Sequence, residues 1–289
     1  DKMMLQEPPN IGEMVLHHTA DAYSIGIEPF FAFSWHRWPD LHLGPLTVNL
    51  TPTKHVIFLF IAAILVFLTM WGTGRSLEKQ RAGKSAPRGF ANAMESIVLY
   101  VRNEIAIANI GHESGAKYAP FVMSLFFFIL YCNLLGLVPH GASPTGNVAV
   151  TGALAICSLI AIEVGGFLKL GPKGYMRTIF PKVPGLEGTG GMVMSIAMGP
   201  IEVIGKFVKP FALTVRLFGN MTAGHFVILS LLGLIFLFGN LHYWNWSIGF
   251  AATGLVIGIM MLEMFVALLQ AYVFALLTAV FIGMMQHEH

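Results

Sequence analysis

Two apolar stretches in the C-terminal half of the chain are far longer than a helix needs to cross a membrane. They cover about residues 192–239 and 247–285, roughly 48 and 39 residues. A helix perpendicular to the bilayer crosses its hydrocarbon layer of about 30 Å with about 20 residues. Each stretch must therefore be a broken helix or a strongly tilted one. The aromatic and polar joint GNLHYWNW between them suits a turn at the membrane surface, so we expect an antiparallel helical hairpin.

The composition of the chain indicates a membrane protein. Of its 289 residues, 55% are hydrophobic and 11% are charged, whereas a soluble domain carries about 25% charged residues. The net charge of +2 comes without a basic tract, so nucleic acid is not an expected partner. We predict an all-α polytopic membrane protein without a cofactor or a metal site. Cys132 and Cys157 lie in apolar runs and are interpreted as core thiols rather than as a disulfide or metal pair.

Three shorter apolar runs have the length of single spans; they are residues 55–72, 118–138 and 148–168. Lys and Arg gather in the loops after the first and third of these runs, and the loop between the second and third has neither. Basic loops face the cytoplasm. The segment 1–54 is therefore expected outside, and the membrane domain 55–289, with its hairpin at about 192–286, ends in the cytoplasm.

Residues 87–110 are only moderately apolar, because Glu95, Arg102 and Glu104 interrupt the hydrophobic positions. Such a segment suits an amphipathic helix that lies in the membrane interface. An ordinary helix packed against other subunits has the same pattern, and the two interpretations are compatible.

Arg216 stands in the middle of the first long apolar stretch. Placing an arginine at the centre of a lipid-facing helix costs roughly 2.5–3.5 kcal/mol, and arginine cannot lower this cost by losing its proton. No acidic residue lies beside it at helical spacing on its own segment. Its counter-charge is therefore expected from elsewhere, with another chain as the favoured source. Asn220 follows one turn later on the same face.

The expected hairpin brings two pairs of polar residues to matching levels. With the turn near residues 243–244, Arg216 lies level with Gln270. His225 lies level with Glu263, to within roughly 3 Å along the axis. Buried ionisable groups in membranes often mark ion paths, and a His–Glu pair is suited to relaying protons. A purely structural salt bridge is the equal alternative for this pair.

A polar stripe leads from the cytoplasmic end of the first long stretch to its centre. Its members follow helical spacings of four, three and seven residues: Glu202, Lys206, Lys209 and Arg216. His225 points to the opposite side of the helix from Arg216, because the two are nine residues apart. The sequence therefore predicts two separate polar tracks. Glu163, in the cytoplasmic half of its span, is expected to form a salt bridge with Lys206 or Lys209.

The stretch RLFGNMTAGH, at residues 216–225, resembles the most specific motif of subunit a of F-type ATP synthases, the membrane subunit beside the rotating ring of c subunits. The segments GPIEVIGKFVKPFALTVRLFGNM and FVALLQAYVFALLT extend the similarity, as do PRGFANAMESIV and KYAPFVMSLFFFILYCNLLGLVP. The resemblance covers roughly residues 50–289. It implies the stator subunit of a rotary ATP synthase in the inner (plasma) membrane of a bacterium, with two offset half-channels for protons against the c-ring.

The resemblance implies roles at matching positions. Arg216 matches the arginine that faces the c-ring carboxylate and separates the half-channels, with Asn220 after it in the motif. Gln270 matches a glutamine of the last helix. Further positions match polar residues of the channels: Glu202 and Lys209 on the cytoplasmic side and Asn133 on the outer side. The implied partners are the c-ring, the peripheral stalk of subunit b, the rest of the complex and membrane lipid.

Two positions depart from some bacterial relatives in that family. The relatives have Glu and His in exchanged order at the positions of His225 and Glu263, so the pair is retained with its sides swapped, which favours direct contact. Where some relatives have an aspartate, this chain has Gly136. Polarity at the channel entrance is then expected from another group, such as His140, or from water. The similarity leaves open whether the ion is H⁺ or Na⁺.

The alternative class is an ion-coupled secondary transporter, whose broken helices and buried charges look similar. A transporter predicts internal repeats and a self-contained substrate cavity, and the two long stretches share no polar pattern. A purely structural scaffold does not explain the matched polar levels. The tetrapeptide AGKS at 82–85 lacks the first glycine of a phosphate-binding loop. Together with the resemblance, which implies a proton-transporting ATPase, this makes a non-nucleotide-binding subunit the expected role of the chain.

Overall fold

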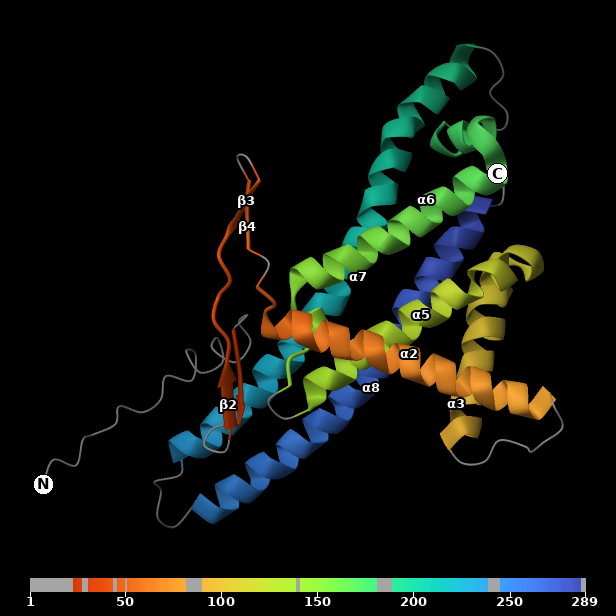
Figure 1. The fold of residues 1–289 in the computed structure, drawn as a ribbon. Coiled ribbons are helices and arrows are strands. Elements are labelled where there is room, and N and C mark those ends of the chain that lie inside the picture. Colours follow the sequence, from red (N-terminus) through yellow and green to blue (C-terminus); the bar gives the residue numbers. More distant parts are fainter. Residues whose placement is uncertain are drawn as a thin grey trace, which may run out of the picture. The chain divides into compact units, whose positions relative to one another are not determined.

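The computed structural model describes most of the chain, namely residues 23–27, 31–43, 46–49, 51–81, 90–138, 141–180, 189–238 and 245–286. From residue 54 onward the described segments are helical apart from short connections (Figure 1). Five of these helices are long and apolar enough to cross a membrane. The predicted fold class, an all-α polytopic membrane protein, is confirmed for this part of the chain.

The three shorter spans are α2 (Lys54–Arg81), α5 (His112–Leu137) and α6 (Val148–Ile179). The sequence predicted that a loop begins after residue 168, and this is wrong, because α6 continues to residue 179. It changes direction at Gly171, whose φ of 67° lies in the left-handed region that favours glycine. Pro172 follows, and its fixed φ suits the first turn of the next helical segment.

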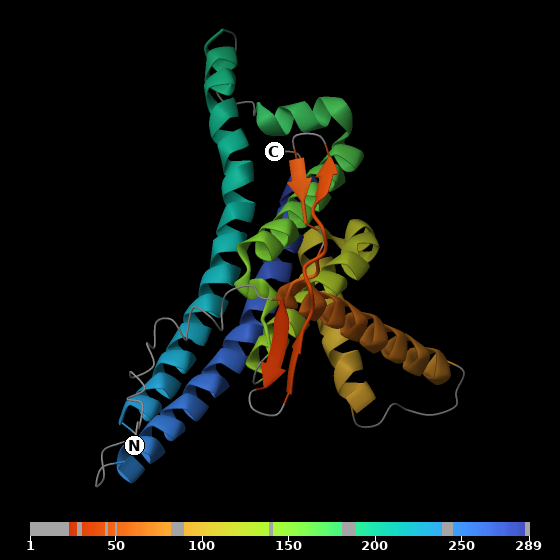
Figure 2. The same cartoon turned by 60° about the vertical axis from the view of Figure 1, so that its left-hand side comes forward.

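The two long apolar stretches form continuous helices. Helix α7 covers Thr189–Phe238, 50 residues, and α8 covers Asn245–Gln286, 42 residues (Figures 1 and 2). Neither Pro200 nor Pro210 ends α7. At a rise of 1.5 Å per residue the helices are roughly 75 and 63 Å long, about twice the hydrocarbon thickness. The broken-helix alternative is therefore wrong, and strong tilt in the membrane is the remaining prediction.

Short β-hairpins precede the first span. Strand β1 (Ser24–Ile27) pairs with β2 (Phe31–Ser34), and β3 (Leu41–Leu43) pairs with β4 (Leu46–Val48), both antiparallel. The sequence predicted little regular helix here, and the strands themselves were not predicted. Hairpins this short are marginal alone in water, so they depend on the rest of the protein.

The amphipathic segment is a composite helix, made of α3 (Phe90–Tyr100), the π-helix η1 (Val101–Ile107) and α4 (Ala108–Ile110). In η1 the apolar side chains Val101, Ile105 and Ala106 are buried, and the polar side chains Arg102, Asn103 and Glu104 are exposed. The predicted amphipathic character is confirmed. The wider π turn, which sequence periodicity did not reveal, sets the buried face of this helix.

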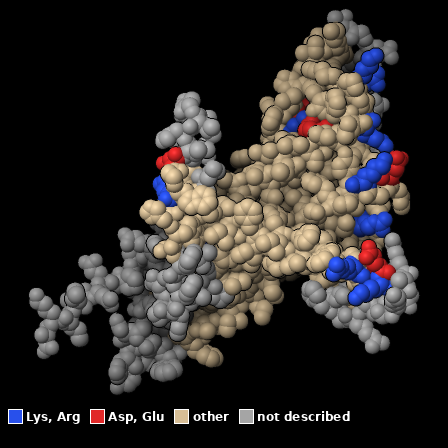
Figure 3. Space-filling view, viewed as in Figure 1, with Lys and Arg blue, Asp and Glu red and all other residues tan. Residues whose placement is uncertain are grey.

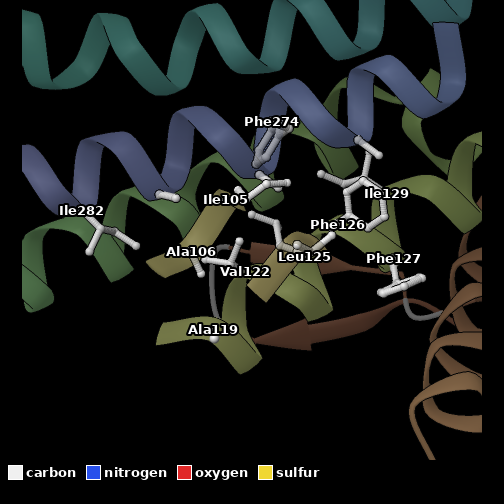
Figure 4. Packing of buried hydrophobic residues seen from close by; sticks show 14 of the residues in the cluster. Ile105, Ala106, Ala119, Val122, Leu125, Phe126, Phe127, Ile129, Phe274 and Ile282 are labelled. Carbon is white, nitrogen blue, oxygen red and sulfur yellow. The ribbon is translucent and has the colours of Figure 1, made fainter. Parts of the chain in front are cut away.

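The chain forms two compact units, and α7 and α8 contribute to both. The first unit comprises Asp1–Ala62, Cys132–Asn147 and Phe218–Leu268, and the second comprises Ala63–Tyr131, Val148–Leu217 and Leu269–His289. The hydrophobic core belongs to the second unit. There Phe126 and Ile129 of α5 pack with Ile105 of η1 and with Phe274 and Ile282 of α8 (Figure 4). Because lipid tails are as apolar as these side chains, close packing rather than escape from water holds the helices together.

Small residues on one face of α8 allow this close packing. Ala271, Ala275 and Ala279 are fully buried at intervals of four residues, and Gly283 comes next. A Cβ at Gly283 would lie 2.1 Å from the backbone oxygen of Asn109. Small residues of this kind let the backbones of membrane helices approach closely. The composite amphipathic helix therefore packs so closely on α8 at this point that only glycine fits.

We predict that Gly283→Ala destabilises the protein by about 1–3 kcal/mol, because the added methyl group collides with a backbone atom that cannot rotate away. Thermal unfolding of the purified protein in detergent measures this effect as a lower Tm. Gly258→Ala is the matched control, because it lies on the same helix and a Cβ there meets nothing within 4 Å. An equal Tm for both variants would contradict the prediction.

The surface of the molecule suits contact with lipid. In the view of Figure 3, most Lys, Arg, Asp and Glu side chains lie at the margins, and a broad area between them is uncharged. Both cysteines are free thiols, Cys132 buried and Cys157 exposed. The prediction of a core thiol is thus wrong for Cys157, because an apolar run in a spanning helix can face lipid as well as protein.

Candidate ion path

A histidine and a glutamate meet inside the first unit, between α7 and α8. His225 Nδ1 lies 2.9 Å from Glu263 Oε1, and the side chains are 23% and 4% exposed. The contact expected from the hairpin spacing is therefore present. The distance is that of an ion pair, although the two groups are not aligned as a hydrogen bond requires.

A backbone carbonyl sets the protonation of His225. Its Nε2 lies 3.1 Å from the carbonyl oxygen of Gly136 on α5, and because a carbonyl only accepts, Nε2 carries the hydrogen. In a neutral imidazole, Nδ1 then presents a lone pair to the carboxylate of Glu263. The two facing atoms, Nδ1 and Oε1, are 2.9 Å apart, close enough for one proton to be shared between them. His225 and Glu263, called the dyad below, thus place two groups that can each bind a proton side by side.

Two glycines make room around this dyad. A Cβ at Gly224 would lie 2.7 Å from Glu263 Oε1. A Cβ at Gly136 would lie 2.5 Å from Ser143 Cβ and 3.2 Å from His225 Cε1. No side chain fits at Gly136 unless its neighbours move. Polarity at this level comes from the Gly136 carbonyl and the Ser143 hydroxyl.

Asn133 is completely buried on α5, in the first unit. Its Nδ2 donates to the Ala267 carbonyl of α8 at 3.2 Å, and its Oδ1 accepts from the Thr145 hydroxyl at 2.6 Å. Ser143 Oγ lies 2.8 Å from Thr145 Oγ1. Sequence reasoning missed Ser143 and Thr145, because they are ordinary loop residues by composition and only their burial singles them out. His140, the other group expected at this entrance, lies outside the described residues.

Arg216 lies on an exposed face of α7. Leu213 and Leu217, on the adjoining face, are buried in the core of the second unit, 3% and 1% exposed. Gln270 of α8 is buried in the same unit, and Asn220, one turn further along α7, is exposed. No carboxylate among the residues described forms an ion pair with Arg216. That a counter-charge for Arg216 comes from another chain therefore stays a prediction.

Glu163 of α6 forms the expected salt bridge with α7. Lys206 Nζ lies 3.1 Å from Glu163 Oε2, with the side chains 10% and 24% exposed. The Tyr175 hydroxyl donates to the same carboxylate oxygen and lies 3.4 Å from Lys206 Nζ. Tyr175 follows the bend at Gly171. The cluster therefore fastens the bent end of α6 to α7, and the structural interpretation of Glu163 is favoured.

Part of the polar stripe of α7 lines a small hollow in the second unit. Glu163, Lys206, Lys209 and Phe281 are among the residues that line it. Lys209 Nζ lies 5.0 Å from the centroid of the Phe281 ring, and Glu202 is half-buried. No cluster of three or more potential metal ligands occurs in the described part of the chain.

The fold and these sites define a class of protein. It is an integral membrane protein whose long apolar helices carry a permanent cation and a buried pair of ionisable residues, an arrangement typical of proteins that pass ions across membranes.

Comparison with known proteins identifies the family. Residues 45–283 match the family model described as ATP synthase A chain. ATP synthase subunit a of Chloroherpeton thalassium is 43% identical over 276 residues, which cover 94% of this chain and 77% of the relative. ATP synthase subunit a of Myxococcus xanthus is 46% identical over 250 residues, covering 84% and 76%. ATP synthase subunit a 2 of Chlorobaculum tepidum is 42% identical over 277 residues, covering 94% and 72%. The chain therefore belongs to the ATP synthase A chain family.

Family membership confirms the resemblance that the motifs implied. The chain is a multi-pass membrane protein of an ATP synthase complex and serves as its proton-translocating stator subunit. The alternative, an ion-coupled secondary transporter, is not favoured.

Proposed function

We propose that protons cross through two half-channels that meet a rotating c-ring. They enter from the outer side past Asn133, His225 and Glu263, and neutralise a carboxylate on the ring. After nearly a full turn of the ring, each proton leaves through a cytoplasmic path near Glu202. Arg216 attracts the ionised ring carboxylate and blocks direct passage between the two paths, because its own charge cannot leave as a proton.

The observation that carries this proposal is the exposed Arg216 on a spanning helix, without an ion pair to any described residue. Leaving that charge in hydrocarbon costs roughly 2.5–3.5 kcal/mol. A carboxylate about 4 Å away recovers about 4 kcal/mol at an effective dielectric constant of about 20. One carboxylate from a partner is therefore enough to offset the cost. Gln270 and Asn220 add neutral polar groups near this point without competing for the charge.

The dyad suits the outer half-channel because it holds a proton without holding net charge. If His225 passes its proton to Glu263, or the reverse, the pair stays neutral. A buried site that stays neutral avoids the large cost of an isolated charge in an apolar environment. Each arriving proton can then displace the one already held, and the displaced proton moves toward the ring.

On the cytoplasmic side, Glu202 and Lys209 are the proposed path residues. Glu163 supports this path indirectly, because it neutralises Lys206 next to the same hollow. Without this counter-charge, Lys206 would repel a proton and raise the free-energy cost of moving it past the hollow. One elementary charge crossing 100 mV supplies about 2.3 kcal/mol, so several protons must be combined for each ATP.

The basic residues that follow the apolar runs of α2 and α6 support a defined orientation. Segment 1–54 lies outside and the C-terminus in the cytoplasm, with the chain in a bacterial plasma membrane. The peripheral stalk of subunit b holds the chain still while the ring turns past Arg216.

A photocrosslinking experiment tests the partner. Ala212 is exposed one turn before Arg216. A photoreactive benzoylphenylalanine at position 212 should capture the small ring subunit in the intact complex, because this face of α7 is proposed to face the ring. The same amino acid in place of Leu168, which is 74% exposed on α6, is the control and should not capture the ring. Mass spectrometry identifies the products. Failure to capture the ring subunit from position 212 would refute the proposed interface.

A further inference from the structure

We propose that Thr145 is a positioning residue for proton entry. It fixes the amide of Asn133, and Asn133 in turn holds α5 against α8 beside the dyad of His225 and Glu263. Asn133 then acts as a brace and not as a carrier of protons. This inference rests on the outer path proposed above and deepens it.

The loop that leads into α6 turns its polar side chains inward. Ser143 is 5% exposed and Thr145 is 0% exposed, as is Asn133 on α5. The short 3-10 helix η2 (Pro144–Gly146) lies in this loop and directs the two hydroxyls toward α5. Buried polar groups must find partners inside the protein. This loop therefore has a specific internal contact to make.

The hydrogen bonds of this contact can run in only one direction. The Asn133 nitrogen must face the Ala267 carbonyl, because a carbonyl only accepts, so the oxygen of the amide faces Thr145. Thr145 therefore donates its single hydroxyl hydrogen to Asn133. The 2.8 Å contact between the two hydroxyls then requires Ser143 to donate to Thr145 rather than to the Cys132 carbonyl, which lies further away, at 3.4 Å. The order of donation is Ser143, Thr145, Asn133 and finally the Ala267 carbonyl.

A chain of this kind cannot relay protons. It ends on a backbone carbonyl, which has no proton to pass on, and an amide side chain does not ionise near neutral pH. By contrast, His225 Nδ1 and both Glu263 oxygens are buried without a hydrogen-bond partner in the described part of the protein. These three atoms belong to ionisable groups, and they lie at the dyad and not along the brace.

The brace holds both sides of the dyad at once. Ala267, where the chain of donors ends, lies one turn after Glu263 on α8. Gly136, which lies one turn after Asn133 on α5, accepts from His225 of α7. Helix α5 therefore contacts α8 through Asn133 and α7 through Gly136. Loosening Asn133 shifts α5, and both members of the dyad lose their alignment.

Substitutions at Thr145 test this role in membranes that contain the complete complex. Thr145→Val keeps the shape of the side chain but removes the donor, so Asn133 is left with a buried, unsatisfied oxygen. We expect about a tenfold loss of proton-driven ATP synthesis per assembled complex. Thr145→Ser keeps the hydroxyl and should stay within about twofold of the unchanged protein. Thr145→Ala also removes the donor and provides the same test if the valine variant fails to assemble.

A double-mutant cycle separates a brace from a second path residue. If Thr145 acts only through Asn133, the variant Asn133→Ala with Thr145→Val should be no slower than Asn133→Ala alone. If the two losses multiply, or if the serine variant is as slow as the valine variant, the positioning role of Thr145 is refuted. The proposed role of His225 and Glu263 is not affected by that result. Thr73→Val is the control, because the buried Thr73 donates to a carbonyl of its own helix. It should leave the rate unchanged.

Discussion

Replacing Arg216 by alanine is expected to lower proton-driven ATP synthesis by roughly 100-fold or more, the usual effect of removing a preorganised charge from a working site. The ring carboxylate then has no cation to attract it in its ionised form. The barrier between the two proton paths is lost as well, so the membrane should also leak protons passively. ATP synthesis driven by an imposed proton gradient measures the first effect, and decay of that gradient without nucleotide measures the second.

Two further variants show whether position or mere charge matters. Arg216→Lys keeps a cation, but lysine can release its proton, so synthesis should remain impaired. Arg75→Ala is the control, because Arg75 is also an arginine at the membrane, exposed and stacked on Trp71 at 3.9 Å from the ring centroid. The Arg75→Ala variant should synthesise ATP from the proton gradient at the normal rate. Normal rates of synthesis in the Arg216→Ala variant would show that the assignment of Arg216 is wrong.

The spanning helices were predictable from the sequence because the bilayer imposes a simple rule of length. Any apolar run of about 20 residues crosses it, and the ends of α7 and α8 lie within a few residues of the expected ones. The contact between His225 and Glu263 was predictable for a related reason. A tight turn fixes which residues of a helical hairpin are level, so spacing alone brought the two together.

Other features depend on contacts that spacing does not encode. Ser143 and Thr145 matter because their loop folds inward, and nothing in the local sequence distinguishes this from a loop that faces water. The bend of α6 did have a signal, since Gly171 and Pro172 are typical of a helix that ends and restarts. The exposure of Cys157 shows a further limit, because hydropathy does not tell lipid from protein interior.

Exchanging His225 and Glu263 is expected to preserve more proton-driven synthesis than removing either residue. His225→Ala or Glu263→Ala leaves one ionisable group without its partner, so the neutral dyad cannot form. We expect each single alanine to cost roughly 100-fold or more in rate, as for loss of a proton-transfer group. The double exchange restores a histidine and a carboxylate facing each other, with one proton between them as before.

The exchange variant should nevertheless recover only part of the rate of ATP synthesis, for two structural reasons. A glutamate at position 225 cannot donate to the Gly136 carbonyl as the imidazole does at 3.1 Å, so the new pair loses its fixed protonation. A histidine at position 263 also needs more room beside Gly224, where a Cβ would already lie 2.7 Å from the carboxylate. Rates of proton-driven ATP synthesis in the two alanine variants and the exchange variant test this prediction. If the exchange variant is no faster than the single alanine variants, the two side chains work separately and the dyad is not the proton-holding unit.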